Sequence, residues 1–218
     1  LKDQGIHVNA KTVWRLMSKK GWLSSNRQRI QRPGRRHEGQ VAVLASNNRW
    51  ASDFTEIQAW NGERLKLAVI IDCADRMILA WSLKKRMTAE NLCEMLKEAI
   101  YARFGSNSTK AKGIEFLSDN GSVYLSEKFR ELLKQFGMIP CRTPIRSPES
   151  NGIAEAFFGT LKRDYVYQSC LETSQDIEGQ TLGWIKDYNE IAPHSALKMM
   201  SPVKYYANWI SQNWKLAV

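Results

Sequence analysis

Hydrophobic residues near the start of the chain recur with the period of a helix. The positions that recur are Val8, Val13, Leu16 and Met17. Asn9 stands where a helix cap belongs and Gly21 follows the last apolar position, so the pattern predicts a short helix over residues 10–20. Residues 24–40 are polar and basic and contain Pro33-Gly34, a composition typical of a linker.

From residue 48 onward the pattern changes to one of strands and amphipathic helices. Three strands are predicted at 49–58, 63–73 and 77–83. Asn61-Gly62 is a strong hairpin-turn signal, and residues 74–76 form a second short connection. We therefore expect these three strands to be antiparallel neighbours.

The rest of the chain alternates helical and strand patterns. We predict a helix capped by Thr88 that runs to 104, a strand at 114–118, a helix capped by Ser126 that runs to 136, a strand at 138–142, and helices near 151–165, 174–190 and 201–214. Three strands, a helix, a strand, a helix, a strand and then helices is the order found in ribonuclease-H-like folds. We therefore expect an α/β protein whose five-stranded mixed sheet is flanked by helices.

Positive charge is concentrated at the amino-terminal end. The net charge of +10 is carried mostly by residues 1–40, where ten Lys or Arg stand against Asp3 and Glu38. A basic block of this density is an electrostatic footprint for DNA phosphates, although a charged tail that only aids solubility is the alternative. We therefore divide the chain into a basic helical segment with its linker, 1–40, and a main domain, 41–218. The candidate DNA contacts of the basic segment are Lys11, Arg15, Lys19, Lys20, Arg35 and Arg36.

Composition argues against several other classes of protein. No apolar run reaches the roughly 18 residues of a membrane span. The first residues lack the pattern of a secretory signal, so we expect a soluble, intracellular protein with no membrane partner. The four cysteines form no C-x-x-C pair and only three histidines are present, which argues against a zinc module or a disulfide framework.

Three acidic residues occupy positions where a catalytic carboxylate would be useful. Asp53 lies in the middle of the first predicted strand, Asp119 follows the end of the fourth, and Glu155 falls in the first turns of a helix after a Pro-rich loop. At 4 Å and an effective dielectric near 20, each pair of carboxylates would repel by roughly 4 kcal/mol, so their convergence requires a cation. Carboxylate oxygens without His or Cys favour Mg²⁺ or Mn²⁺, and two such ions would suit an in-line displacement at phosphorus. Asp72 and Asp75 are rivals for the first carboxylate, although Asp is also common at the end of a hairpin.

Four motifs, in order, resemble those of insertion-sequence transposases encoded in a second reading frame, and more distantly those of retroviral integrases. The motifs are W-A-S-D-F-T around Asp53, L-S-D-N-G-S around Asp119, S-P-E-S-N-G-I-A-E-A-F-F-G-T-L-K around Glu155, and Y-N-E-I-A-P-H-S-A-L-K-M-M-S-P over 188–202. Members of this superfamily share an Asp, Asp, Glu triad with thirty-five residues between the last two, which is the separation of Asp119 and Glu155. The resemblance implies a catalytic triad of Asp53, Asp119 and Glu155 that binds Mg²⁺ or Mn²⁺, with two ions expected.

The resemblance also implies DNA contacts near the triad. It assigns Lys162 to transposon-end DNA, with a solvated helix charge as the alternative. Positions seven apart in a helix lie within about 20° of each other, so Lys162 shares a face with Glu155. Asn120 and Arg163, the neighbours of Asp119 and Lys162, are further candidate DNA contacts.

Two features depart from the family pattern. Ala192 stands where the family usually has Arg, which leaves His194 of the closing motif with either a structural or a functional role. Such transposases usually have further amino-terminal helices, and the segment G-I-H-V-N-A-K-T-V-W-R-L-M, which begins at Gly5, resembles the end of their helix-turn-helix-like module. We therefore expect residues 1–40 to be an incomplete DNA reader.

The expected function is transposition by two successive phosphoryl transfers. Metal-activated water nicks DNA at the element end, and the freed 3′-hydroxyl then attacks a target phosphodiester, without a covalent enzyme intermediate. Such a transposase of the Asp, Asp, Glu type would act on DNA as a homo-oligomer in the bacterial cytoplasm, at the nucleoid. Two alternatives stay open: a DNA-binding or regulatory relic with an inactive domain, and a nuclease that degrades RNA–DNA hybrids with the same fold and metals.

Overall fold

The computed structural model describes residues 5, 7–23, 43, 45–142 and 152–217. The chain divides into two compact units, Leu1–Val41 and Ala42–Val218. The first unit contains the predicted helix, α1 (Ala10–Lys19), and the side chain of Asn9 accepts a hydrogen bond from the Lys11 N–H at its start, at 2.9 Å. None of the residues of α1 is buried. The linker predicted at 24–40 lies outside the described residues.

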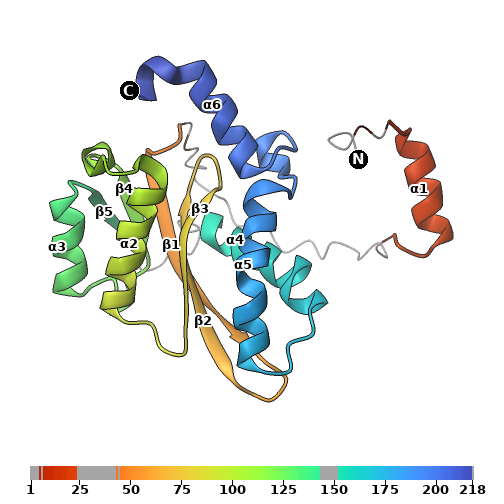
Figure 1. The fold of residues 1–218 in the computed structure, drawn as a ribbon, viewed down its shortest axis with the longest axis horizontal. Helices are drawn as coiled ribbons and strands as arrows, with labels where there is room; N and C mark the ends of the chain where they lie inside the picture. The colour runs from red at the N-terminus through yellow and green to blue at the C-terminus, as the bar shows by residue number, and fades with distance from the viewer. Residues whose placement is uncertain (1–4, 6, 24–42, 44, 143–151, 218) are drawn as a thin grey trace, which may run out of the picture. The chain divides into compact units, whose positions relative to one another are not determined.

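The second unit is built around a five-stranded mixed sheet in the order β3-β2-β1-β4-β5 (Figure 1). The strands are β1 (Arg49–Gln58), β2 (Arg64–Asp72), β3 (Ile78–Lys84), β4 (Glu115–Ser118) and β5 (Ile139–Arg142). β1 and β2 pair antiparallel, as do β2 and β3, whereas β4 pairs parallel with both β1 and β5. This sheet confirms the prediction, and the strand ends differ from the predicted ends by at most one residue.

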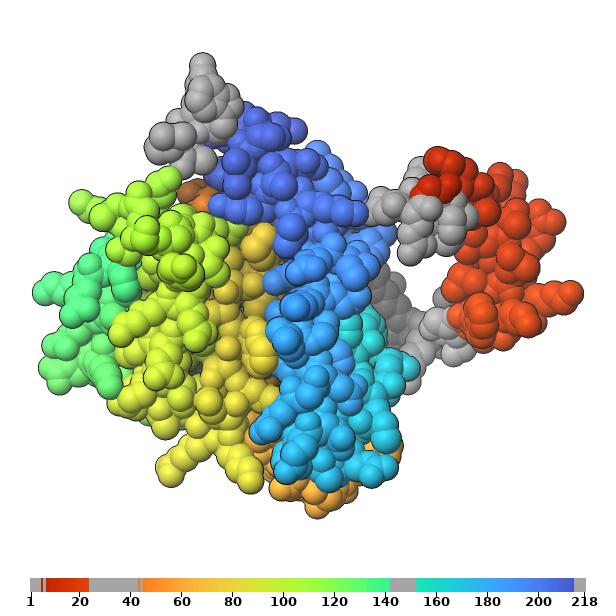
Figure 2. Space-filling view, in the orientation of Figure 1, coloured from red at the N-terminus to blue at the C-terminus, as the bar shows by residue number. Residues whose placement is uncertain are grey.

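Helices cover both faces of the sheet (Figure 1). On one face lie α2 (Ala89–Phe104) and α3 (Glu127–Gln135), and on the other lie α4 (Gly152–Asp164) and α5 (Ser174–Glu190). The short 3-10 helices are η2 (Ser108–Ala111), η4 (Val166–Gln168) and η5 (Ser195–Leu197), and the chain continues into α6 (Pro202–Ala217). In the space-filling view, β3 is seen between α2 and α5 (Figure 2).

In the second unit, α2 and α3 also begin at the predicted caps. The Thr88 hydroxyl accepts a hydrogen bond from the Asn91 N–H, and the Asn91 side chain accepts one from the Thr88 N–H, so α2 starts with a reciprocal capping box. The Ser126 hydroxyl accepts from the Phe129 N–H at the start of α3. These bonds satisfy backbone donors that have no partner inside the helix, which is why each helix begins there.

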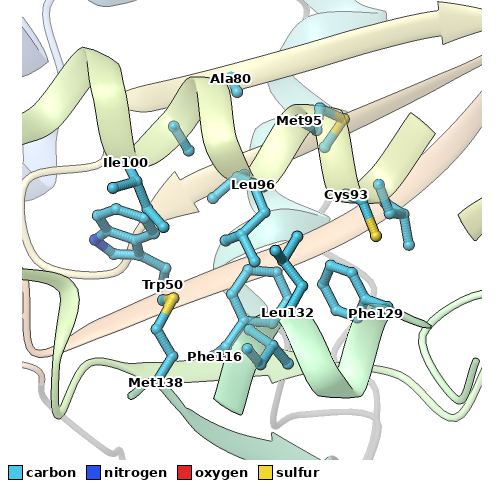
Figure 3. Packing of buried hydrophobic residues seen from close by; sticks show 14 of the residues in the cluster. Trp50, Ala80, Cys93, Met95, Leu96, Ile100, Phe116, Phe129, Leu132 and Met138 are labelled. Atoms are coloured by element: carbon cyan, nitrogen blue, oxygen red, sulfur yellow. The ribbon is translucent and has the colours of Figure 1, made fainter. Parts of the chain in front are cut away.

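Two hydrophobic layers hold the sheet and its helices together. In the first layer, α2 and α3 pack on the sheet around Trp50 and Phe116, and the ring of Phe116 meets that of Phe129 edge-on with centroids 5.4 Å apart (Figure 3). The second layer joins α4 and α5 to the opposite face, which includes Ala51 and Leu117. Full burial of one such large side chain contributes about 1.5–3 kcal/mol. Trp50 and Ala51 lie in different layers because successive residues of a strand point to opposite faces.

Two further observations concern membrane-spanning helices and disulfide bonds. Among the described residues, no helix combines the length and the apolar character that crossing a membrane requires. All four cysteines are unpaired thiols, and Cys73 and Cys93 are buried.

Candidate active site

The pairing of β1 with β4 brings two predicted carboxylates to one place on the sheet. Ala51 of β1 lies opposite Leu117 of β4 in a parallel pair, and Asp53 and Asp119 each come two residues later. Side chains two apart in a strand share a face, so both carboxylates belong to the face of Ala51 and Leu117, on which α4 and α5 pack. Neighbouring strands are about 4.8 Å apart, so this register makes the two carboxylates close neighbours.

Asp53 is half-buried in the middle of β1. Its Oδ1 accepts a hydrogen bond from the Phe54 N–H at 2.8 Å. Burial raises the pKa of Asp53 to about 6 against the lowering effect of this bond, and the charges of Asp119 and Glu155 raise the pKa further. Asp53 therefore experiences the charge of both other predicted carboxylates, and a nearby cation would relieve both repulsions.

Asp119 is held by the turn that follows β4. Its Oδ1 accepts a hydrogen bond from the Gly121 N–H at 2.9 Å. A methyl group built on Gly121 would meet the same oxygen at 2.9 Å, so the turn approaches the carboxylate as closely as only glycine allows. Asn120, the predicted DNA contact beside Asp119, is exposed.

Tyr124 and Ser52 lie on the opposite face of the sheet from Asp53 and Asp119 and support both of them. The Tyr124 hydroxyl and Ser52 Oγ are hydrogen-bonded at 2.9 Å, and both residues are buried. Burial raises the pKa of Tyr124, and the charges of Asp53 and Asp119 raise it further. Tyr124 thus links the turn that carries Asp119 to the residue that precedes Asp53. Sequence reasoning missed both Ser52 and Tyr124, because no local pattern marks a hydrogen bond between residues this far apart.

Glu155 lies in the first turn of α4, which packs on the same face of the sheet as Asp53. The buried residues of this helix are Ala154, Phe157, Phe158 and Leu161. Glu155 is exposed, and Lys162 is half-exposed seven residues later on the same side of the helix. Between them, a methyl group built on Gly159 would meet nothing within 4 Å, so this side of α4 is open.

The donor atoms suit a hard divalent cation, but the three carboxylates do not form a closed cage. Asp53 and Asp119 offer adjacent oxygen ligands, the type that Mg²⁺ and Mn²⁺ prefer. Within the described part of the chain, no group of three or more His, Cys, Asp or Glu is close enough to hold a metal ion. Asp53 and Asp119 could therefore hold such a cation, and Glu155 would have to approach them to become a third ligand.

The rival carboxylates Asp72 and Asp75 are engaged elsewhere. Both side chains are fully buried beside Arg103, whose Nη2 lies 2.8 Å from Asp75 Oδ2 and 3.4 Å from Asp72 Oδ2. Asp72 also accepts the Asn47 N–H at 2.7 Å. Burial and the charge of Asp75 raise the pKa of Asp72, while Arg103 lowers it. The guanidinium also lies over the ring of Tyr206, 3.9 Å from its centroid, so this ion cluster joins α6 to the sheet.

The other predicted DNA contacts fall into three groups. Lys11, Arg15 and Lys19 are exposed on α1, and Lys20, the cap after its last residue, is exposed as well. Arg35 and Arg36 lie outside the described residues. Arg163 donates to both carboxylate oxygens of Asp164, at 2.6 and 2.7 Å, and these contacts raise the pKa of Arg163. Arg163 is therefore partly neutralised by its neighbour.

His194 in the closing motif has a structural environment. Its Nε2 lies 3.1 Å from the carbonyl oxygen of Tyr188, and its ring meets that of Tyr188 edge-on at 4.5 Å. Tyr188 in turn packs against Phe157 of α4 with centroids 4.9 Å apart. Burial is the main cause that lowers the pKa of His194. The closing motif therefore supports the helix that carries Glu155.

Comparison with known proteins gives consistent results. The family model described as integrase core domain matches residues 44–148, and a second model of the same description matches residues 137–202. An insertion element IS136 protein from Agrobacterium fabrum is 47% identical over 177 residues, which cover 80% of this chain and 90% of that protein. The transposase InsD for insertion element IS2 from Escherichia coli is 38% identical over 199 residues, which cover 91% of this chain and 66% of that protein.

Two solved structures are similar in fold. The catalytic core domain of HTLV-2 integrase in complex with magnesium has a TM-score of 0.56 at 18% identity, covering 75% of this chain and 98% of that chain. The catalytic domain of the Mos1 mariner transposase has a TM-score of 0.51 at 16% identity, covering 64% and 70%. At these identities the likeness concerns the ribonuclease-H-like fold alone.

Proposed function

Because this chain belongs to the insertion-sequence transposases of the retroviral integrase superfamily, we propose that it cuts and joins DNA strands by metal-dependent phosphoryl transfer at Asp53, Asp119 and Glu155. Members of this family are polynucleotidyl transferases that act in transposition. The observation that carries the proposal is the register of β1 and β4, which makes Asp53 and Asp119 neighbours on the face packed by α4. The charges of Asp119 and Glu155, which raise the pKa of Asp53, are consistent with it.

Each carboxylate has a separate role in this proposal. Asp53 and Asp119 hold the cation, Asp53 from the rigid centre of the sheet and Asp119 from the turn that Gly121 and Tyr124 hold in place. Glu155 closes the site when the start of α4 moves towards the sheet. Bound Mg²⁺ or Mn²⁺, with two ions expected, would activate the attacking oxygen and stabilise the leaving oxygen.

The reaction consists of two exchanges at phosphorus. In the first, the oxygen of water forms a bond to phosphorus at the element end, the bond from phosphorus to the 3′-oxygen breaks, and that oxygen leaves as a 3′-hydroxyl. In the second, this hydroxyl loses its proton and its oxygen attacks a target phosphodiester, whose own 3′-oxygen leaves. Asn120 contacts a phosphate beside the reacting bond, and Lys162 contacts a phosphate farther along the element-end DNA. No side chain of the protein becomes covalently bound to DNA.

The basic amino-terminal segment and an oligomer complete the proposal. α1 and its cap present Lys11, Arg15, Lys19 and Lys20 to DNA phosphates, so residues 1–40 act as a DNA-binding segment and residues 41–218 as the catalytic part. Two DNA ends must be handled together, so the protein acts as a homo-oligomer on DNA at the nucleoid. The HTLV-2 integrase catalytic core domain has been described in a trimeric and in a dimeric form, which supports an oligomer.

The test compares variants that keep the fold and lose one carboxylate. Asp119→Asn and Glu155→Gln are expected to bind labelled element-end DNA as the parent does, but to cut and join it at least about a hundredfold more slowly with Mg²⁺. Removal of a residue that only hydrogen-bonds a metal ligand costs about 10–100-fold in activity, and loss of a ligand itself should cost at least as much. The matched control is Glu131→Gln, an exposed helical glutamate on α3, which should leave the rate unchanged.

The same assay separates the alternatives. Parent-like cleavage and joining by folded, DNA-bound Asp119→Asn would overturn the catalytic assignment. Hydrolysis of an RNA–DNA hybrid without any joining would indicate a nuclease instead. DNA binding without metal-dependent cleavage by the parent itself would indicate an inactive relic.

A further inference from the structure

A cleft outside the three carboxylates lies between the β1–β2 turn and the end of α4. Its volume is about 380 Å³, and its walls include Trp60, Tyr167 and Lys162, with Ile57 and Leu171 as apolar lining. Trp60 is 68% exposed and Tyr167 is 73% exposed, so most of each aromatic ring is left in water. Large aromatic side chains left exposed around a concave surface are a common mark of a binding site.

Backbone hydrogen bonds hold the two sides of this cleft together. The Trp60 N–H donates to the Leu171 carbonyl at 2.8 Å, and the Asn61 N–H donates to the Glu172 carbonyl at 3.1 Å. Glu63 reinforces the join because it accepts from the Asn61 side chain and from the Ser174 N–H, each at 2.9 Å. The Asn61 bond is the main cause that lowers the pKa of Glu63 to about 2. The cleft is therefore preformed, and a ligand does not need to order it.

The ammonium group of Lys162, on the wall of the cleft, can contact a phosphate. Among the ion pairs of the described residues, none involves Lys162, whereas Glu56, also on the cleft wall, pairs with Arg64 at 3.2 Å. Lys162 lies seven residues after Glu155 on the same side of α4, about 10 Å along the helix axis. One strand of B-DNA advances about 3.4 Å per phosphate, so this distance corresponds to roughly three nucleotides.

We infer that this cleft binds one unstacked nucleobase of the element-end DNA, roughly three nucleotides from the reacting phosphate. The base stacks against both Trp60 and Tyr167 while the ammonium group of Lys162 contacts its phosphate. Aromatic faces accept any base, so the cleft favours locally opened DNA rather than a particular sequence. This inference rests on the proposed function, because it takes the reacting phosphate to lie at the three carboxylates.

The test uses the full chain and two labelled element-end duplexes. One duplex is fully paired, and the other has two mismatched nucleotides placed three positions from the cleavage site. The parent is expected to bind the mismatched duplex at least about fivefold more tightly, the lower end of what one base–aromatic stack contributes. Trp60→Ala and Tyr167→Ala should lose that preference while Trp60→Phe keeps it. The control is Tyr101→Ala, because Tyr101 is 71% exposed on α2, away from the cleft.

A second measurement reports on the stack itself. A 2-aminopurine base at the mismatched position should change its fluorescence when the parent binds, and should not change when Trp60→Ala or Tyr167→Ala binds. Equal affinity of the parent for both duplexes, or a preference that survives in both alanine variants, would overturn the inference. If the parent prefers the mismatched duplex but shows no metal-dependent cleavage, the proposed function is wrong and the cleft is still a nucleobase site. If the parent cleaves DNA but binds both duplexes equally, the proposed function stands and the inference about the cleft is wrong.

Discussion

A methyl group at Gly121 would collide with the carboxylate of Asp119. In Gly121→Ala the new Cβ would lie 2.9 Å from Asp119 Oδ1, and ordinary van der Waals contact at this position starts at 3.4 Å. The carboxylate must therefore move by about 0.5 Å, and the 2.9 Å hydrogen bond from the Gly121 N–H to the same oxygen must weaken. Because this oxygen is the free end of a side chain, the collision falls on the position of the carboxylate and not on the backbone.

The expected magnitudes separate stability from activity. Gly121 does not have a positive φ, so alanine restricts the unfolded chain and is expected to change the free energy of unfolding by no more than about 1 kcal/mol. A misplacement of 1 Å in a catalytic group can cost about a hundredfold in rate, so the shift at Asp119 should slow cleavage about tenfold. The measurement is the single-turnover rate of cleavage of labelled end DNA with Mg²⁺, together with urea unfolding of the same preparations.

Gly183→Ala is the matched control for this experiment. Gly183 lies in α5, and a methyl group built there meets nothing within 4 Å. This variant should cleave DNA at the parent rate. The reasoning would be refuted if folded Gly121→Ala cleaved as fast as the parent, or if Gly183→Ala lost as much activity as Gly121→Ala.

Two further predictions concern the clusters that support the site. Arg103→Met leaves the buried carboxylates of Asp72 and Asp75 without their cation, so it should lower the free energy of unfolding in urea by about 3–5 kcal/mol, and a loss below about 1 kcal/mol would contradict the role of this cluster. His194 has a lowered pKa in the folded protein, mainly because of burial, so it binds fewer protons there than in the unfolded chain. The contribution of neutral His194 to stability is full above its ordinary pKa of 6.5 and is lost as the pH falls towards the lowered pKa. His194→Gln should therefore flatten the decline in unfolding free energy below pH 6.5. The same slope of unfolding free energy against pH in the parent and the variant would contradict this.

The local pattern of the sequence was sufficient to predict the elements and the position of each carboxylate on its own element. Alternation along 49–58 and the Asn61-Gly62 turn predict the first hairpin, because a strand and a tight turn depend on residues within a few positions of each other. In the same way, the helical period alone puts Glu155 and Lys162 on one side of α4. The family motifs then pointed to Asp53, Asp119 and Glu155 as a set.

The tertiary structure decided which of these elements meet. Asp53 and Asp119 are sixty-six residues apart, and they become neighbours only because β4 pairs with β1 and not with the free edge of β3. The same nonlocal packing pairs Asp72 and Asp75 with Arg103 and hydrogen-bonds Tyr124 to Ser52. It also brings Trp60 and Tyr167 to the walls of one cleft. Strand pairing and helix packing depend on the combined burial of all the segments, so the periodicity of any one segment does not contain them.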